Sequence, residues 1–310
     1  MSDLTEPTRL LMVDPAHYEV CYSINPWMEP GRWQQDPVGL HAQAVAASHA
    51  LREALESAGA VVEMAPGAPG LPDMVFPANA GVVLDGRALV ARFHHVERRG
   101  EEPHFLAIFE SLRARGWLHE VGQLPEGCFQ EGAGDCHWDA TRGHFWAGFG
   151  PRSSRASIDA LAAFFGQEVV PLELVSDRCY HLDVGFCVLS GGHILYLPDA
   201  LTEAARRALR ERVSDHWLIE GDEDDLRHFN LNAVSLVGPQ GPTVVTTRCT
   251  PRLRAVLQGH GYQVVEVDLS PFMLSGGGAY CMTLNLSRHS RLPLAPPEHH
   301  AELPGPHGAA

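Results

Sequence analysis

The sequence repeats a local pattern in which an amphipathic stretch ends at a glycine and a short apolar run follows directly. The four instances read AGAVVEM, RGWLHEV, FGQEVVPL and HGYQVVEV, and they begin at residues 58, 115, 165 and 260. Glycine readily adopts the left-handed backbone that ends a helix, and runs rich in Val favour strands. The pattern therefore predicts a chain built from about five ββαβ-like units rather than one doubly wound sheet.

Short apolar runs and amphipathic stretches alternate along the chain, which is typical of an α/β protein. We expect strands at residues 9–13, 61–65, 81–84, 88–93, 144–147, 168–172, 182–189, 193–197, 233–237, 243–246, 263–267 and 280–286. We expect helices at residues 40–58, 102–115, 154–165, 201–213 and 251–259. Neither a glycine-rich dinucleotide fingerprint after a strand nor a P-loop lysine motif is present, which argues against nucleotide binding through those motifs.

Composition limits the possible partners and the number of domains. The 310 residues carry 38 acidic and 23 Lys and Arg side chains, a formal net charge of −15 at pH 7. Nucleic acids and anionic membranes need basic surface, so we expect neither as a partner. With no long apolar run and no apolar signal core at the N-terminus, we expect a cytoplasmic protein. We expect one catalytic domain over residues 1–290 and a flexible Pro-, Gly- and His-rich tail over residues 291–310.

The seven cysteines are scattered along the chain and include no CxxC pair. This is the pattern of a reduced intracellular protein, in which most thiols are inert, rather than of a secreted disulfide framework. The His299–His300 pair in the tail lacks a third ligand at a fixed spacing. We therefore expect no metal site and no cofactor.

Four islands of polar or glycine residues interrupt strand-like sequence. They are LPDMVFPANAG with Asp73 and Asn79, FQEGAGDCHWD with Glu131 and Asp135, YHLDVGFCVL with His181 and Asp183, and SGGGAYCMTLNL with Cys281. Each island alone also fits a structural role, because Asp and Asn favour turns and a buried Cys behaves as a small apolar residue. Together they offer a thiol, a histidine and a carboxylate, which is the set that cysteine-dependent catalysis requires. Dispersed positions are typical of such a set, since the fold assembles it.

The islands, in their order along the chain, resemble those of the guanidino-group-modifying superfamily, which has the pentein fold. The similarity is strongest to the bacterial dimethylarginine dimethylaminohydrolase-like and arginine dihydrolase branch. It extends from DPAHYEVCYSINPWM, residues 14–28, to GGGAYCMTLNL, residues 276–286. The resemblance implies a five-bladed α/β propeller of ββαβ-like units around a central polar channel. It also implies that His181 and Cys281 each begin a strand that faces this channel.

The resemblance implies a role for each candidate residue. Cys281 matches the nucleophile, His181 the general acid/base and Glu131 the carboxylate that pairs with the histidine or the substrate. The residues that match substrate-binding positions are Asp73, Asn79, Arg98, Asp135, Arg152 and Asp183. This fits the chemistry of a guanidino amino acid, because carboxylates complement a guanidinium and arginines complement an α-carboxylate.

The implied activity is hydrolysis at the guanidino carbon of arginine or a methylated arginine through a covalent thiouronium intermediate. Asn79 and Asp183 slightly favour arginine dihydrolase, which releases ornithine, ammonia and carbon dioxide, over dimethylarginine dimethylaminohydrolase. The enzyme alternative is an amidinotransferase, and the non-enzyme alternative is a binding protein. The resemblance is compatible with a homo-oligomer. Tyr280, next to the nucleophile, departs from the family pattern and leaves open whether a phenol shapes the substrate mouth.

Overall fold

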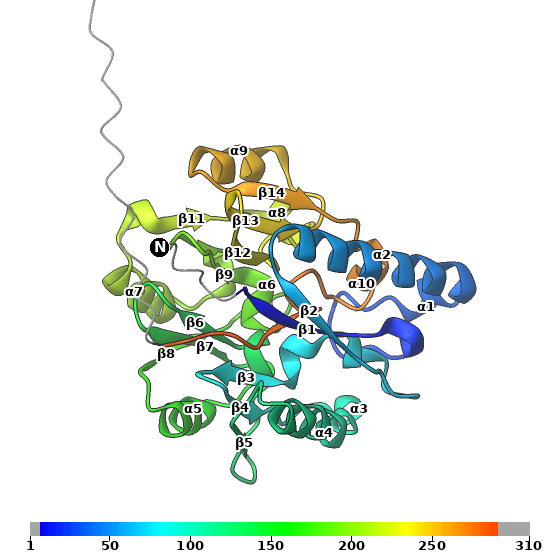
Figure 1. Cartoon of the computed structure of the whole chain (residues 1–310). Coiled ribbons are helices and arrows are strands. Elements are labelled where there is room, and N and C mark those ends of the chain that lie inside the picture. The colour runs from blue at the N-terminus through cyan, green and yellow to red at the C-terminus, as the bar shows by residue number, and fades with distance from the viewer. Residues whose placement is uncertain (1–6, 291–310) are drawn as a thin grey trace, which may run out of the picture.

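The computed structural model describes residues 7–290 and shows five three-stranded sheets arranged in a ring (Figure 1). The sheets, each written from its first strand to its third, are β15 (Leu284–Asn285), β1 (Arg9–Val13) and β2 (Val61–Ala65); β3 (Gly81–Leu84), β4 (Arg87–Val90) and β5 (Glu120–Gln123); β6 (Cys136–Asp139), β7 (His144–Phe149) and β8 (Val169–Glu173); β9 (Phe186–Val188), β10 (Ile194–Tyr196) and β11 (Leu218–Glu220); and β12 (Val234–Gly238), β13 (Gly241–Thr246) and β14 (Gln263–Glu266). In every sheet the middle strand pairs antiparallel with the first strand and parallel with the third. Because β15 pairs with β1, strands from opposite ends of the chain close the ring. The predicted five ββαβ-like units are confirmed.

A helix connects the middle strand to the third strand of each unit and lies on the outside of the ring (Figure 1). These connecting helices are α2 (Pro37–Ser57), α4 (Glu101–Ala114), α5 (Ser157–Phe165), α7 (Glu203–Arg212) and α9 (Pro251–Gly259). Five short helices lie in the same connections as these long ones: η1 (Pro15–His17), α1 (Pro30–Trp33), α3 (Val96–Arg99), η5 (Pro198–Ala200) and η6 (Asp215–Trp217). The connections between units contain η2 (Pro72–Val75), η3 (Pro77–Ala80), η4 (Gly132–Gly134), α6 (Leu182–Gly185), α8 (Glu223–Arg227) and α10 (Ser270–Met273).

Local sequence explains where the connecting helices begin and end. Asp36 accepts a hydrogen bond from the Gly39 amide at the start of α2, and Thr250 accepts one from the Leu253 amide at the start of α9. The helix α5 ends at Gly166, which has a left-handed φ of 65°. The glycines of the other three repeated patterns also have positive φ. The repeated glycines therefore end the helices, as the sequence pattern predicts.

Two strand predictions beside the polar islands are wrong at their starts. Residues 182–185 form the short helix α6, and the strand β9 begins only at Phe186. The chain turns here because the amide of Leu182 donates a hydrogen bond to the Asp135 carboxylate. Of residues 280–286, only Leu284–Asn285 are in a strand, since the preceding residues form a hydrogen-bonded turn. His181 and Cys281 therefore do not begin strands.

Three further strands, β5, β6 and β11, lie outside the runs predicted as strands. Each is only three or four residues long. Two of them, EVGQ and CHWD, contain few of the apolar residues on which a strand prediction depends. The expected flexible tail, with His299–His300, lies outside the described residues.

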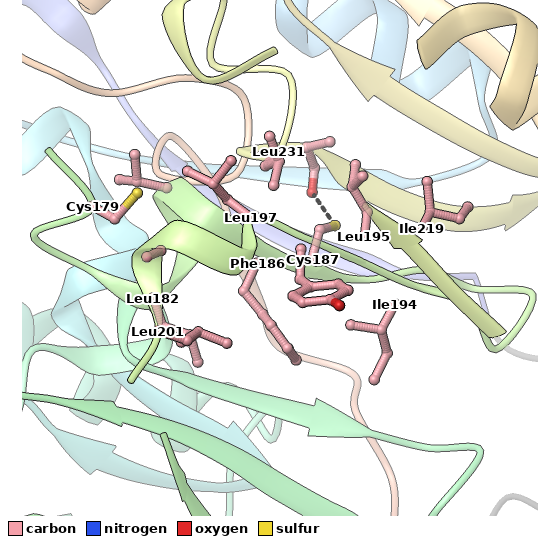
Figure 2. Packing of buried hydrophobic residues seen from close by; sticks show 14 of the residues in the cluster. Cys179, Leu182, Phe186, Cys187, Ile194, Leu195, Leu197, Leu201, Ile219 and Leu231 are labelled. Carbon is pink, nitrogen blue, oxygen red and sulfur yellow. Dashed lines mark hydrogen bonds between the residues drawn. The ribbon is translucent and has the colours of Figure 1, made fainter. Parts of the chain in front are cut away.

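The largest cluster of buried apolar side chains fills the space around β9, β10 and α7 (Figure 2). Phe186, Ile194 and Leu195 are fully buried in it. The thiol of Cys187 donates a hydrogen bond of 3.3 Å to the carbonyl of Ala233, just before β12. This contact joins the fourth unit of the ring to the fifth. Within residues 7–290, no helix has both the length and the apolar character needed to cross a membrane.

Candidate active site

Polar side chains from distant parts of the chain surround a small buried cavity of about 10 Å³, which is the space of one water molecule. Its lining residues are Ile24, Asn25, Asp73, Phe76, Asn79, Arg98, Arg152, Tyr180, Ser275 and Cys281. Five of the nine predicted site residues are among them. The other four, Glu131, His181, Asp183 and Asp135, are buried behind this lining.

Cys281 is 2% exposed and lies in direct contact with Asp183. Its thiol donates a hydrogen bond of 3.1 Å to Oδ2 of Asp183. Nδ2 of Asn232 donates a second hydrogen bond, of 3.0 Å, to the same sulfur. Burial and the neighbouring Asp183 carboxylate raise the pKa of Cys281 well above its usual value. The thiol therefore keeps its proton until a positive charge enters the site.

One carboxylate oxygen of Asp183 has no hydrogen-bond partner among residues 7–290. The residue is fully buried, and Oδ1 is unsatisfied while Oδ2 accepts from Cys281. Burial raises the pKa of Asp183 to about 7, although hydrogen bonds from Cys281 and Asn232 oppose the rise. A buried acceptor without a partner is costly and usually marks a place where a ligand or water binds. Here it offers an anionic acceptor beside the reactive sulfur.

Glu131 and His181 form a buried hydrogen-bonded pair. Nε2 of His181 lies 2.6 Å from Oε2 of Glu131, and Nη1 of Arg152 donates to the same oxygen at 3.0 Å. Burial alone would raise the pKa of Glu131, but Arg152 and His181 hold it far below its usual value. Glu131 is therefore ionised and directs the Nε2 proton of His181 toward itself. The other ring nitrogen, Nδ1, lies 3.4 Å from Nδ2 of Asn79 at the cavity lining.

Arg98 and Asn79 form a second buried network. Nη1 of Arg98 donates to Oδ1 of Asn79 at 2.8 Å, which aims the amide nitrogen of Asn79 at His181. The guanidinium of Arg98 also binds both carboxylate oxygens of Glu101, each at 2.8 Å. Arg98 lines the cavity, but most of its donors are already engaged by the protein.

Asp73 and Arg152 occupy the wall of the cavity. The hydroxyl of Tyr22 donates to Oδ2 of Asp73 at 3.0 Å, and burial raises the pKa of Asp73. Arg152 lies over the ring of Tyr180, 4.8 Å from its centroid, and donates to the carbonyl of Ile24. Four of the six side chains that the sequence assigns to substrate binding, Asp73, Asn79, Arg98 and Arg152, therefore line one small cavity.

Asp135 lies outside the lining of the cavity. Its carboxylate is buried, accepts from the amide of Leu182 at 2.9 Å and from the hydroxyl of Ser153 at 2.6 Å, and does not line the cavity. Burial raises the pKa of Asp135 to about 6. Because Leu182 follows His181, Asp135 fixes the turn that presents the histidine.

Sequence reasoning missed Asn232, Glu101 and Tyr180. Glu101 looks like an ordinary acidic residue in the first turn of a helix, and Tyr180 is adjacent to His181 without any motif of its own. Tyr280 does not shape the cavity, because its ring stacks on His137 at a centroid distance of 4.7 Å and an interplanar angle of 10°. Within residues 7–290, no group of three or more His, Cys, Asp or Glu side chains is placed to hold a metal ion.

Comparison with known proteins assigns the chain to a family. The model of the family described as N,N-dimethylarginine dimethylhydrolase, eukaryotic, matches residues 30–288. The chain belongs to this dimethylarginine dimethylhydrolase family. A family member from Mycobacterium tuberculosis, N(G),N(G)-dimethylarginine dimethylaminohydrolase, is 34% identical over 280 residues, which cover 90% of this chain and 85% of that protein.

Two bifunctional arginine dihydrolase/ornithine cyclodeaminases are also similar to this member of the family. ArgZ of Synechocystis sp. is 36% identical over 96% of this chain, and AgrE of Nostoc sp. is 37% identical over 93% of it. The chain spans only 39% of the length of each of these proteins.

Solved structures support the fold. The N-terminal domain of ArgZ, as a cysteine-to-serine mutant bound to substrate, matches with a TM-score of 0.82 and 36% identity over 91% of this chain and 99% of that one. A dimethylarginine dimethylaminohydrolase adduct with S-methyl-L-thiocitrulline matches with a TM-score of 0.72 over 90% of this chain and 99% of that one. At 22% identity this second match shows the shared fold alone.

Proposed function

We propose that the chain is a cysteine-dependent arginine dihydrolase, which converts free arginine to ornithine, ammonia and carbon dioxide. The observation that carries this proposal is the unpartnered Oδ1 of the fully buried Asp183, whose other oxygen contacts the sulfur of Cys281 at 3.1 Å. A guanidinium is planar, always charged and forked, so it suits an ionised carboxylate with a free oxygen. Binding there places the guanidino carbon beside the nucleophile.

The reaction then follows from the surrounding groups. The substrate cation lowers the cost of ionising the thiol, because it supplies a positive charge next to Cys281. The thiol proton passes to Nδ1 of His181 as the thiolate attacks the guanidino carbon. Nδ1 then delivers this proton to the departing amine as the C–N bond breaks. This step releases the first ammonia and leaves a covalent thiouronium at Cys281. Water, with His181 as the base, adds to the thiouronium carbon and displaces the second ammonia, which leaves a thiocarbamate on the same sulfur. A second water then releases the Cys281 thiol and the carbamate of ornithine, which loses carbon dioxide. Over the full reaction, arginine and two water molecules give ornithine, two ammonia molecules and one carbon dioxide.

Glu131 supports this proton transfer by holding His181 in one orientation. Glu131 stays ionised and accepts the Nε2 proton of His181, which leaves Nδ1 facing the cavity lining. Arg152 offsets the buried charge of Glu131 and lines the cavity, where it complements the α-carboxylate of an amino acid.

Asn79 favours release of two ammonia molecules over release of citrulline. The family resemblance implies that Asn at this position is typical of the dihydrolases, and that Asp there is typical of the deiminases and of many methylarginine hydrolases. In this chain the amide is fixed by Arg98, and its nitrogen lies beside His181 and the carbonyl of Glu131. The similarity to the arginine dihydrolase domains of ArgZ and AgrE supports the same activity.

Dimethylarginine hydrolysis to citrulline and dimethylamine is the second candidate. It is favoured by the matching family model and by the M. tuberculosis relative, most of whose length this chain covers. An amidinotransferase shares the covalent intermediate and differs only in the amine that accepts the amidino group. The binding-protein alternative is disfavoured because Cys281, His181 and Glu131 are all present.

The test is a substrate panel with every product identified. The purified protein is incubated with arginine, asymmetric dimethylarginine, agmatine and guanidino acids, with and without glycine as an amine acceptor. We expect ornithine and ammonia from arginine, and none from the Cys281→Ser variant. Citrulline accumulating without ornithine would overturn the dihydrolase proposal. A new guanidino compound formed with glycine would identify a transferase.

We also infer a cytoplasmic location and a single catalytic domain over residues 1–290. Seven free cysteines support a reducing compartment, and the pairing of β1 with β15 supports one closed unit. Association into a homo-oligomer remains part of this proposal, and light scattering of the purified protein measures it.

A further inference from the structure

Asn232 lies at the centre of the contacts around the proposed nucleophile. The residue is fully buried just before β12. Its Nδ2 donates to the sulfur of Cys281 at 3.0 Å and to the carbonyl of Asp183 at 3.2 Å. Its Oδ1 accepts from the amides of Cys281 and Gly278, both at 3.1 Å. Both donors and both acceptor positions of the side chain are therefore used at the nucleophile turn.

The backbone around Asn232 is held in place by packing. Leu231 and Ala233 are fully buried, and Figure 2 shows Leu231 among the apolar side chains of the largest cluster. The thiol of Cys187 holds the carbonyl of Ala233, and the carbonyl of Asn232 accepts from the amide of Tyr280 at 3.2 Å. The amide group of Asn232 is therefore presented to Cys281 in one orientation.

Gly278 allows the backbone before Cys281 to lie close to the side chain of Asn232. A Cβ atom added at Gly278 would lie 2.9 Å from Oδ1 of Asn232, closer than real Cβ atoms approach. The glycine-rich turn before the nucleophile therefore serves to bring backbone amides against one asparagine.

Asn232 and Asp183 have opposite effects on the sulfur. The Asp183 carboxylate accepts a hydrogen bond from the thiol and raises the pKa of Cys281, whereas the hydrogen bond from Asn232 lowers that pKa. A thiol sulfur is a weak acceptor, so a donor aimed at it gains most when the sulfur becomes a thiolate. The same donor also limits the rotation of the side chain about its Cα–Cβ bond.

We propose that Asn232 is a further residue of the catalytic machinery, which stabilises the thiolate of Cys281 and fixes its direction of attack. This inference rests on the proposed function for its role in turnover, but the effect on the thiol itself is independent of the substrate.

The test is the rate at which iodoacetamide alkylates Cys281 between pH 6 and pH 10, followed by mass spectrometry of the Cys281 peptide. Asn232→Asp keeps an acceptor for the two amides but replaces the donor to sulfur by a carboxylate oxygen. We expect alkylation at pH 7 to slow by about 10- to 100-fold, because a hydrogen bond to a charged group is lost. The rate of the variant should stay below that of the wild type across the whole range from pH 6 to pH 10.

Asn230→Asp is the matched control. Asn230 is also buried, lies two residues away, and binds the carbonyl of Arg248 and the amide of Thr250 without contacting Cys281. We expect its alkylation profile to match that of the wild type even where its melting temperature falls. Asn232→Ser, which removes the donor without adding charge, provides a second variant if Asn232→Asp does not fold.

The outcomes separate this inference from the proposed function. A folded Asn232→Asp or Asn232→Ser variant with the wild-type alkylation profile would overturn the role of Asn232. If neither Asn232 variant folds while Asn230→Asp does, Asn232 is a structural residue and the inference is also overturned. A wild-type protein that turns over no arginine would instead overturn the proposed function, whatever the alkylation rates.

Discussion

Replacing Asp183 by Asn should raise the free energy of unfolding of the protein and at the same time weaken its binding of arginine by more than about 100-fold. The usual pKa of an Asp is 3.8, and burial raises that of Asp183 to about 7. Each pH unit between the two values corresponds to about 1.4 kcal/mol. Ionised Asp183 therefore lowers the free energy of unfolding by about 4 kcal/mol above pH 7.

The sign of this effect depends on pH. The folded protein holds the Asp183 proton more tightly than the unfolded chain, so the contribution of Asp183 to stability falls as the pH rises from about 4 to about 7. Asn cannot ionise, and it has nearly the same shape. The variant should therefore exceed the wild type by about 4 kcal/mol at pH 8 and by little at pH 4. For a chain of 310 residues this is a rise in melting temperature of about 6 °C at pH 8.

The effect on binding has the opposite direction. A guanidinium that loses its buried carboxylate partner loses about 3–5 kcal/mol of binding free energy, which is about a 150- to 5,000-fold rise in Kd. Calorimetric titration of arginine into Cys281→Ser, with and without Asp183→Asn, measures this rise without turnover. Affinity in the Cys281→Ser protein should also fall by about tenfold per pH unit below about pH 7, as Asp183 becomes protonated.

Thermal melts at pH 4 and pH 8 measure the stability difference. If the variant is no more stable than the wild type at pH 8, ionised Asp183 does not destabilise the substrate-free protein. A variant that binds arginine as tightly as the Cys281→Ser parent would show that the free oxygen of Asp183 does not receive the guanidinium.

Two further predictions concern Glu131 and Tyr280. Glu131→Gln removes the carboxylate that pairs with both His181 and Arg152, so steady-state assays should show at least about a 100-fold loss of kcat; a loss below about fivefold would contradict the orienting role of Glu131. Tyr280→Phe preserves the stack on His137 and should leave kcat and KM for arginine within about twofold, whereas Tyr280→Ala should lower the free energy of unfolding by about 3–5 kcal/mol in urea titrations. A large change in KM for Tyr280→Phe would show that this phenol reaches the substrate.

The sequence predicts the fold well because each copy of the repeated pattern includes the glycine at which a helix ends. Gly59, Gly116, Gly166 and Gly261 end the helices with positive φ, as each repeat requires. The errors fall beside the polar islands, where tertiary contacts override local preference. Residues 182–185 begin the stretch 182–189 that the sequence assigns to a strand. The Leu182 amide instead donates a hydrogen bond to Asp135, 47 residues earlier in the chain, and residues 182–185 form a short helix.

The site was less predictable than the fold. The resemblance places the candidate residues together, but it does not indicate the contacts of Asp135, whose Oδ1 accepts from the Leu182 amide and whose Oδ2 accepts from the Ser153 hydroxyl. Its predicted role in substrate binding stays a prediction. Asn232 carries no local signal, because an Asn before a strand is common and its four contacts lie 46 to 49 residues away in sequence. Glu101 also carries no local signal in the sequence. Only the structure shows that it forms a buried ion pair with Arg98.

The ratio of ammonia to ornithine formed from arginine tests the central claim most directly. Arginine labelled at the guanidino carbon is incubated with the protein until it is consumed, and ornithine, citrulline, ammonia and labelled carbon dioxide are measured together. We predict two ammonia molecules and one labelled carbon dioxide for each ornithine, with no accumulation of citrulline and no turnover by Cys281→Ser. One ammonia for each citrulline, or turnover that survives Cys281→Ser, would contradict the account.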